Sequence, residues 1–134
     1  MAPMPPGVGR SVAPWTILML LKAPPLSLPG QTVFKRAESA AEFEQVHRLN
    51  HEVFAVEVGQ YPPVRGGRLV DKFDRKNAYH LAIREDQLVG MVAVHDEPPF
   101  SIADRLADPG LLDRLPGRAL EVRLLALRPE VRGK

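Results

Sequence analysis

Paired imidazole and carboxylate side chains are the residues of this chain whose spacing could serve chemistry. His47 and His51 stand four positions apart, which places two possible metal ligands on one face of a helix. No third ligand follows nearby and the H-E-x-x-H order is absent, so we expect no metal site. Asp71 and Asp74 stand three positions apart. Such a pair can hold a substrate ammonium group through charge-assisted hydrogen bonds, or it can bracket a surface loop.

The composition excludes several other kinds of chemistry. The 134 residues include no cysteine, which excludes disulfide bonds, a thiol nucleophile and a cysteine-ligated zinc site. The chain has neither a G-x-S-x-G motif nor a complete phosphate-binding P-loop. Its net charge is +2 without a dense basic tract, so we expect no nucleic-acid partner. The lack of cysteine is typical of a reducing compartment, and we expect a cytoplasmic protein.

The first thirty residues differ in composition from the rest. Residues 1–30 hold half of the chain's 14 prolines, and Arg10 and Lys22 are their only charged side chains. The apolar run at 15–21 resembles the start of a secretory signal, but spanning a bilayer takes roughly 20 apolar residues. We therefore expect a disordered proline-rich leader over 1–30, with a signal peptide as the alternative. We expect no membrane association, and one folded domain over 31–134.

A capping box predicts where the main helix begins. Ser39 and Glu42 have the spacing at which each side chain satisfies a free backbone amide of the first turn. Apolar residues follow at helical intervals, namely Phe43, Val46, Leu49, Val53 and Phe54. The helix should end near Gly59, because glycine tolerates the left-handed conformation. A short strand over 33–37 is predicted before it.

The later part of the chain predicts strands. After a loop over 60–77, alternating residues predict a strand over 78–84, and the apolar run at 88–94 predicts a second strand covered on both faces. Residues 85–87 would join them as an antiparallel hairpin. Short helical turns are predicted next, one capped by Ser101 or Asp104 and one over 111–115. A last strand is predicted over 119–127.

That last strand and the residues after it resemble the GNAT acyltransferase superfamily. The segment Glu121-Val122-Arg123-Leu124-Leu125-Ala126-Leu127 is similar to the family's fourth strand, E-(I/V)-x-x-x-A-(I/L). Arg132, Gly133 and Lys134 match the first three positions of its phosphate loop, (R/Q)-x-x-G-x-(G/A). The resemblance covers roughly 33–134. It implies an α/β fold, the N-terminal part of a GNAT domain with a mixed, largely antiparallel sheet and flanking helices, truncated after the fourth strand.

The resemblance also implies roles. The fourth strand would splay from its neighbour, so that free backbone groups of Leu125, Ala126 and Leu127 pair with the pantetheine arm of acetyl-CoA or another acyl-CoA. Arg132, Gly133 and Lys134 would bind the phosphates, unless they form only a solvated chain end. Glu121 would be the general base, with a pKa raised by partial burial. Alternatively, Glu121 pairs with Arg123 or Arg118.

A narrower resemblance concerns the acceptor. Val53-Phe54 and Asp71-Lys72-Phe73-Asp74 are similar to segments of the acyl-homoserine-lactone synthases and the long-chain N-acyl amino acid synthases. It implies that Asp71, Asp74 and Phe54 shape a pocket for an amine acceptor, either a small molecule or a peptide, and that acyl carrier protein is a possible donor. The chain departs from that pattern, with Asn50 in place of an arginine, Leu69 in place of a glutamate and Tyr61 as the nearest aromatic to an expected tryptophan.

Three functions follow as expectations. The first is an N-acyltransferase that moves an acyl group, most simply acetyl, from acyl-CoA to an amine. The second is an autoinducer-type or N-acyl amino acid synthase with a fatty-acyl donor. The third is a non-catalytic GNAT-like fragment that binds coenzyme A weakly, because the family's remaining helices and strand do not fit before Lys134.

Overall fold

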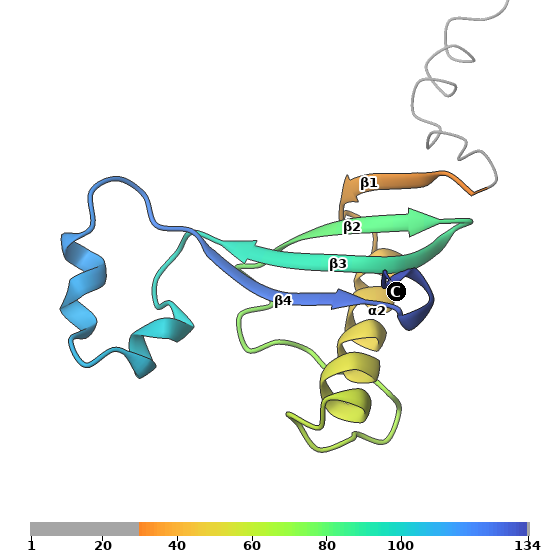
Figure 1. Cartoon of the computed structure of the whole chain (residues 1–134), viewed down its shortest axis with the longest axis horizontal. Helices are drawn as coiled ribbons and strands as arrows, with labels where there is room; N and C mark the ends of the chain where they lie inside the picture. Colours follow the sequence, from red (N-terminus) through yellow and green to blue (C-terminus); the bar gives the residue numbers. More distant parts are fainter. Residues whose placement is uncertain (1–29, 134) are drawn as a thin grey trace, which may run out of the picture.

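The computed structural model describes residues 30–133, and these form an α/β fold. A four-stranded antiparallel sheet carries one α-helix against one of its faces (Figure 1). The leader predicted over 1–30 lies outside the described residues, apart from Gly30, and so does Lys134. Within the described range, no helix combines the length and apolar character needed to cross a bilayer.

The sheet is a simple antiparallel meander. Its strands are β1 (Thr32–Arg36), β2 (Ala78–Arg84), β3 (Gln87–His95) and β4 (Glu121–Leu127), in the spatial order β1-β2-β3-β4. Glu85 and Asp86 join β2 to β3 with φ angles of 50° and 61°. Two left-handed residues in a two-residue turn match the twist of the flanking strands. The predicted hairpin is thus confirmed, and the other strand bounds agree with the predictions within two residues.

The predicted capping box is also confirmed. Helix α2 (Ala40–Asn50) begins after Ser39, whose hydroxyl accepts from the Glu42 amide at 3.2 Å while the Glu42 carboxylate accepts from the Ser39 amide at 3.0 Å. The chain then continues as the π-helix η1 (His51–Glu57). Gly59 ends it with a φ of 69°, as expected. The π-helical geometry was not predicted, because apolar spacing does not distinguish it from an ordinary helix.

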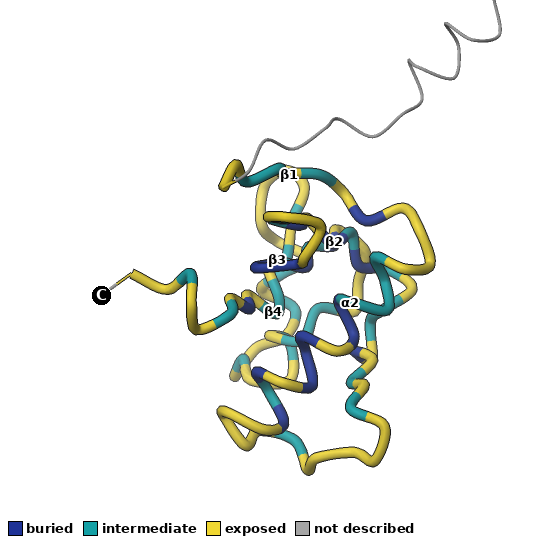
Figure 2. The backbone as a smooth tube through the Cα atoms, turned by 90° about the vertical axis from the view of Figure 1, so that its right-hand side faces the viewer, coloured by how far each residue is buried: buried dark blue, intermediate teal, exposed yellow. Residues whose placement is uncertain are grey.

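The core lies between α2 and the sheet (Figure 2). Val46 and Leu49 from the predicted helical stripe are fully buried against Tyr79 and Leu81 of β2 and Met91 of β3. The other buried members of this cluster are Ala37, Val53, Leu88, Ala93 and Ala126. The alternation predicted for 78–84 therefore turns Tyr79 and Leu81 toward the helix.

The opposite face of the sheet corrects one prediction. The run at 88–94 was expected to be covered on both faces, but the described residues cover only one. Phe34 of β1 is 78% exposed and Leu125 of β4 is 67% exposed on this open face. Together with Leu127 and Val92 they line an apolar hollow of about 380 Å³. The apolar run therefore indicates a hydrophobic strand but does not reveal how many layers cover it.

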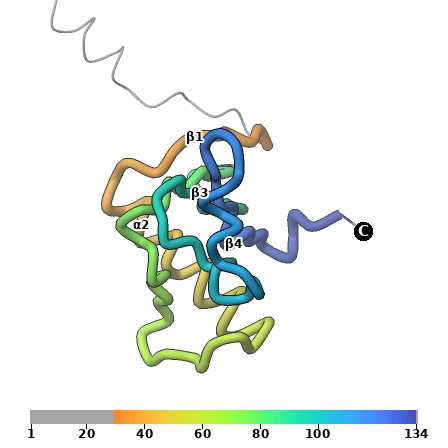
Figure 3. Tube along the Cα trace, turned by 90° about the vertical axis from the view of Figure 1, so that its left-hand side faces the viewer, coloured from red at the N-terminus to blue at the C-terminus, as the bar shows by residue number. Residues whose placement is uncertain are grey.

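The segment between β3 and β4 projects beyond the sheet at the left of Figure 1 and faces the viewer in Figure 3. It holds two short helices, η2 (Ser101–Arg105) and η3 (Pro109–Arg114). The predicted caps of the first one are wrong. Its N-cap is Phe100, which makes no side-chain cap, while Asp108 caps η3 through the Gly110 amide. The Ser101 hydroxyl is instead used in a contact with β4.

Glu42 gives the first testable prediction. Burial opposes its ionised form, but hydrogen bonds from Lys35 and from the Ser39 and Glu38 amides outweigh this effect and lower the pKa of Glu42 to about 2. A lowered pKa stabilises the fold above the ordinary carboxyl pKa, and this stabilisation is lost as pH falls through the folded value. Glu42→Gln should therefore lower the free energy of unfolding by about 1–2 kcal/mol at pH 7.

The loss of unfolding free energy caused by Glu42→Gln should shrink between about pH 4.5 and pH 2. Urea unfolding of the full chain at several pH values measures it. Glu97→Gln is the matched control, because its carboxylate makes no hydrogen bond or ion pair with residues 30–133. A deficit of the same size at pH 7 and pH 2 would contradict the assignment of this pKa.

Candidate functional site

Strand β4 positions the site through a β-bulge. Ala93 pairs with Arg123 and Val92 pairs with Leu125, so Leu124 is an extra residue without a partner on β3. Its φ is 40°, a left-handed backbone that is strained for leucine. The bulge turns the neighbouring side chains of Arg123 and Leu124 to the same face of the sheet, the face that carries α2.

Strand β4 does not splay from β3, its neighbour in the described sheet. The two strands stay paired from Glu121 to Leu127, interrupted only by the bulge. The outer edge of β4 pairs with no strand among residues 30–133, since β4 is the last strand of the sheet. Backbone groups of 125–127 are therefore available to a ligand on the outer edge alone, and the Leu127 carbonyl is already bonded to the Arg132 side chain.

A buried ion pair joins β4 to the loop before β2. The Asp71 carboxylate accepts from Arg123 Nη2 at 2.7 Å and from Arg123 Nε at 3.2 Å, and the side chains are only 4% and 10% exposed. Asp71 also accepts from Asn77 Nδ2 at 2.8 Å and from the Phe73 amide at 3.3 Å. Burial alone would raise the pKa of Asp71, but the hydrogen bonds from Arg123 and Asn77 outweigh it and lower that pKa.

Glu121 lies next to this pair at the start of β4. Its carboxylate accepts from Ser101 Oγ at 2.9 Å, from the Ile102 amide at 3.3 Å and from Arg123 Nη1 at 3.3 Å. Burial again opposes ionisation, yet these donors lower the pKa of Glu121. The expectation of a raised pKa is therefore wrong, because partial burial was considered without the donors that fold around the carboxylate. The expected pairing with Arg123 is confirmed, whereas Arg118 pairs with Asp96.

His95 completes this end of the site. It is the partner of Glu121 in the β3–β4 register, and its Nε2 lies 3.3 Å from a Glu121 carboxylate oxygen. Its Nδ1 lies 2.9 Å from the Glu97 carbonyl, and its ring is stacked on Phe100 at a centroid distance of 5.4 Å. The sequence assigned no role to His95, because only the register places it opposite Glu121.

Asp74 belongs to the same network from the other side. Its Oδ1 lies 3.0 Å from His47 Nε2 and accepts from the Tyr79 hydroxyl at 2.6 Å. Arg68 has only donors and lies 3.3 Å from His47 Nδ1, which makes this nitrogen the acceptor and leaves Nε2–H to donate to Asp74. Burial and the Asp74 carboxylate raise the pKa of the Tyr79 hydroxyl. The Asp74 side chain is 28% exposed, and its other oxygen has no partner among the described residues.

The two acidic residues singled out in the sequence thus lie in one network. Asn77 Nδ2 links them, because it donates to Asp71 at 2.8 Å and to the Tyr79 hydroxyl at 3.3 Å, and that hydroxyl donates to Asp74.

His51 does not join His47 in a metal site, since its Nε2 accepts from the Val64 amide at 2.9 Å. The described part of the chain holds no group of three or more side chains arranged to bind a metal ion.

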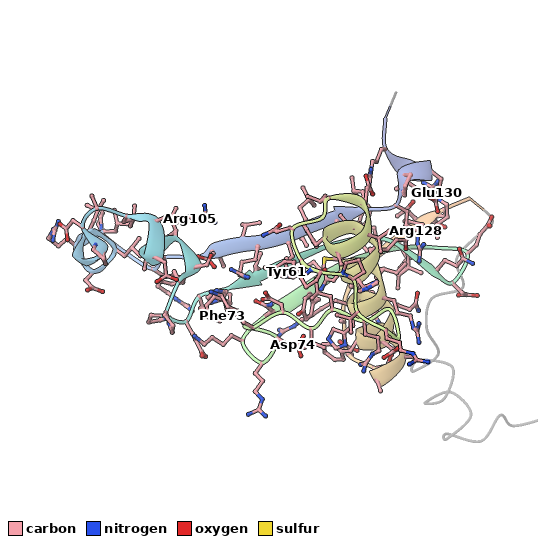
Figure 4. All side chains as sticks on the ribbon, turned by 90° about the horizontal axis from the view of Figure 1, so that it is seen from below. Tyr61, Phe73, Asp74, Arg105, Arg128 and Glu130 are labelled. Carbon is pink, nitrogen blue, oxygen red and sulfur yellow. The ribbon has the colours of Figure 1, made fainter. Side chains whose placement is uncertain are left out.

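A cavity of about 280 Å³ adjoins the bulge on the helix side of the sheet. It is lined by Asn50, Tyr61, Leu69, Val70, Asp71, Lys72 and Leu124. Seen from below, Tyr61, Phe73 and Asp74 all lie along the loop that runs under the sheet (Figure 4). Phe54, expected to shape the acceptor pocket, is half-buried and packs against the core without lining this cavity, and its carbonyl accepts from the Gln60 and Tyr61 amides.

The predicted phosphate-binding residues are placed only in part. The Arg132 guanidinium forms an ion pair with Glu57, with one N–O distance of 2.8 Å, and donates to the Leu127 carbonyl at 2.8 Å. Gly133 lies in open space, and Lys134 is outside the described residues. Arg132 therefore connects the end of β4 to the end of η1 and would have to leave Glu57 to bind an anion.

The arrangement offers a carboxylate held ionised at Glu121, a strand edge with free backbone groups, and a small cavity between them and α2. No protein-family model, no curated protein and no solved structure matches this chain.

The Asp71–Arg123 pair gives the second prediction. Asp71→Asn should lower the free energy of unfolding by up to about 3–5 kcal/mol, because the buried Arg123 charge loses its closest carboxylate and keeps only the contact with Glu121 at 3.3 Å. Asp108→Asn is the matched control: its pair with Arg114 is mostly exposed, and asparagine can keep the cap on Gly110. This control should cost less than about 1 kcal/mol. Urea unfolding of the full chain measures the free energy of both variants. An equal loss in Asp71→Asn and Asp108→Asn would show that the buried ion pair contributes no more to stability than the exposed one.

Proposed function

We propose that this chain belongs to an N-acyltransferase of the GNAT type, which moves an acyl group from acyl-CoA to an amine. The observation that carries the proposal is the bulged edge strand β4. It begins at a carboxylate, Glu121, and continues past a cavity at Leu124. It ends in an edge whose outer backbone groups have no strand partner among residues 30–133.

The chemistry uses these features in order. The amine nitrogen attacks the thioester carbonyl, a C–N bond forms, the C–S bond breaks, and the thiolate leaves as coenzyme A. Backbone N–H groups on the outer edge of β4, over 125–127, donate hydrogen bonds to the thioester oxygen and the pantetheine amides. An edge strand suits this task because its free donors are fixed before the ligand arrives.

Glu121 takes the proton of the attacking amine in this proposal. Its lowered pKa keeps it ionised at neutral pH and makes it a weaker base than the sequence suggested. The donors around it hold the carboxylate in one position, so that no reorientation precedes proton transfer. Asp74, whose second carboxylate oxygen has no partner among residues 30–133, is the other carboxylate that can attract an ammonium group.

Thiol release tests the proposal directly. The full chain is incubated with acetyl-CoA and a panel of amines, and a thiol-reactive dye reports the liberated coenzyme A without background from cysteine. Glu121→Gln should lower kcat/KM by about 100-fold or more, since proton transfer by a positioned side chain contributes roughly 10²–10⁴-fold. Asp86→Asn in the β2–β3 turn is the control and should leave the rate unchanged.

Equal rates for wild type and Glu121→Gln would remove Glu121 from the mechanism, and no thiol release with any amine or donor would refute acyl transfer. Amide NMR shifts at Leu125 to Leu127 upon addition of acetyl-CoA, without thiol release, would support the non-catalytic alternative. In that case the chain binds the donor without completing the reaction.

A fatty-acyl donor is the second candidate, favoured by one observation. Beside Glu121, an open groove of about 550 Å³ is lined mainly by apolar side chains, including Ile102, Leu112, Leu115 and Leu120. Such a groove matches an alkyl chain better than an acetyl group, because burying each methylene is worth about 0.8 kcal/mol.

The donor profile separates the two candidates. For a fatty-acyl enzyme, kcat/KM should rise at least about tenfold from acetyl-CoA to octanoyl-CoA or octanoyl acyl carrier protein. Leu115→Asp should remove this preference while leaving the rate with acetyl-CoA unchanged. A profile that is flat, or highest for acetyl-CoA, would instead support the short-chain transferase.

A further inference from the structure

Asn50 is buried without any side-chain hydrogen bond among the described residues, whereas Asn77, whose Oδ1 also lacks a partner there, keeps two bonds through its Nδ2. Asn50 is the last residue of α2, and its side chain is fully buried. Neither its Nδ2 nor its Oδ1 has a hydrogen-bond partner among the described residues. Its helical neighbours differ in this respect, since His47 bonds to Asp74 and His51 to the Val64 amide. A buried amide without partners is destabilising, which indicates that something outside this set of residues satisfies it.

Asn50 is one of the residues that line the cavity at the bulge, although its two amide atoms expose almost no area themselves. The volume of about 280 Å³ lies near the lower end of the range for small-molecule sites. Leu69, Val70 and Leu124 supply apolar walls, and Leu124 reaches the cavity only because the bulge turns it to this face. Its left-handed backbone is the kind of local strain that clusters at ligand sites.

The charges around the cavity restrict the group that can lie against Asn50. Asp71 lines the wall, but both of its oxygens are occupied by Arg123, Asn77 and the Phe73 amide. The pair with Arg123 thus leaves no net charge at this wall. An ionised ligand group placed against Asn50 would lose its hydration without meeting an opposite charge, which is strongly unfavourable. The group that binds there must therefore be neutral.

The same group must both donate and accept. Asn50 presents a donor at Nδ2 and an acceptor at Oδ1 side by side, and a carboxamide presents the same two functions in reverse. Once the Asn50 side chain turns toward the cavity, two parallel hydrogen bonds satisfy both of its amide atoms. Lys72 also lines the cavity, belongs to the exposed residues and forms no ion pair in the described part of the chain. Its ammonium group favours an anion on the outer end of the ligand.

We propose that the Asn50 cavity binds the carboxamide group of a small molecule, with preference for one that also carries a carboxylate within reach of Lys72. The proposal concerns binding alone and goes beyond acyl transfer, because a carboxamide is not the attacking amine. Binding is measured without an acyl donor, so that its failure and the failure of acyl transfer are distinguishable.

Two ligands of nearly the same shape test the donor–acceptor requirement. Glutaramate carries a carboxamide and a carboxylate, while monomethyl glutarate replaces the amide NH₂ by a methoxy group and so loses the donor. Added to the ¹⁵N-labelled full chain, glutaramate should shift the side-chain NH₂ resonances of Asn50. Monomethyl glutarate should bind at least about tenfold more weakly. Equal shifts from both ligands, or from neither, would overturn the proposal.

Asn50→Leu separates binding from a structural role. Leucine has the same branched shape and no polar atoms, and its larger volume can extend into the adjoining cavity, so the urea midpoint should stay the same or rise because an unpaired buried amide is removed. Glutaramate affinity should fall at least about tenfold. A lower midpoint, combined with no glutaramate binding by the wild-type chain, would mean that internal water satisfies Asn50 and would refute the site. Unchanged affinity in Asn50→Leu would refute it as well.

Lys72 provides the second arm of the test. Lys72→Gln should weaken glutaramate about two- to fivefold, as expected for a partly exposed charge pair, and leave binding of uncharged propionamide unchanged. Lys76→Gln is the matched control, because Lys76 contacts the same Phe73 ring at 4.9 Å but does not line the cavity. An equal loss with both lysine variants would show general charge attraction and contradict a role for Lys72 at the cavity.

Discussion

The ion pair between Asp71 and Arg123 connects two parts of the chain that lie 52 residues apart, and the arrangement of the site depends on it. Placing two charges in the interior is unfavourable unless the pair is well aligned and its remaining polar atoms are hydrogen-bonded. The Asp71–Arg123 pair meets both conditions. Asp71 has four donors, and Arg123 also reaches Glu121. The pair therefore fixes the loop before β2 against the start of β4. It also places Glu121 and the cavity on the same side of the sheet.

Several elements could be predicted because their determinants are local. The capping box of Ser39 and Glu42, the helical stripe and the β2–β3 hairpin depend on residues close in sequence. The alternation of β2 was equally clear, and it placed Tyr79 and Leu81 in the core. These features follow from periodicity and turn chemistry, which operate over a few residues and do not require the rest of the fold.

The site itself was harder to predict because its contacts are long-range. His95 faces Glu121 only through the β3–β4 register, and the bulge at Leu124 sets that register. The lowered pKa of Glu121 depends on Ser101 and Ile102, whose positions follow from the projecting segment rather than from any pattern around Glu121. Asn50 stood out in the sequence only as a departure from a family pattern. Its burial and lack of partners emerge only when helix, loop and strand are assembled.

The bulge determines which residues of β4 lie on each face of the sheet. The strand consists of two half-strands of three residues, 121–123 and 125–127, and Leu124 resets the alternation between them. If Leu124 paired in regular register, one half would be inverted: either the charged residues would move to the open face, or Leu125 and Leu127 would replace Ala126 in the core. One unpaired residue thus shifts the alternation of side chains along the strand by one position. It keeps the polar network on one side of the strand and the hydrophobic surface on the other, at a position where strict alternation would have mixed them.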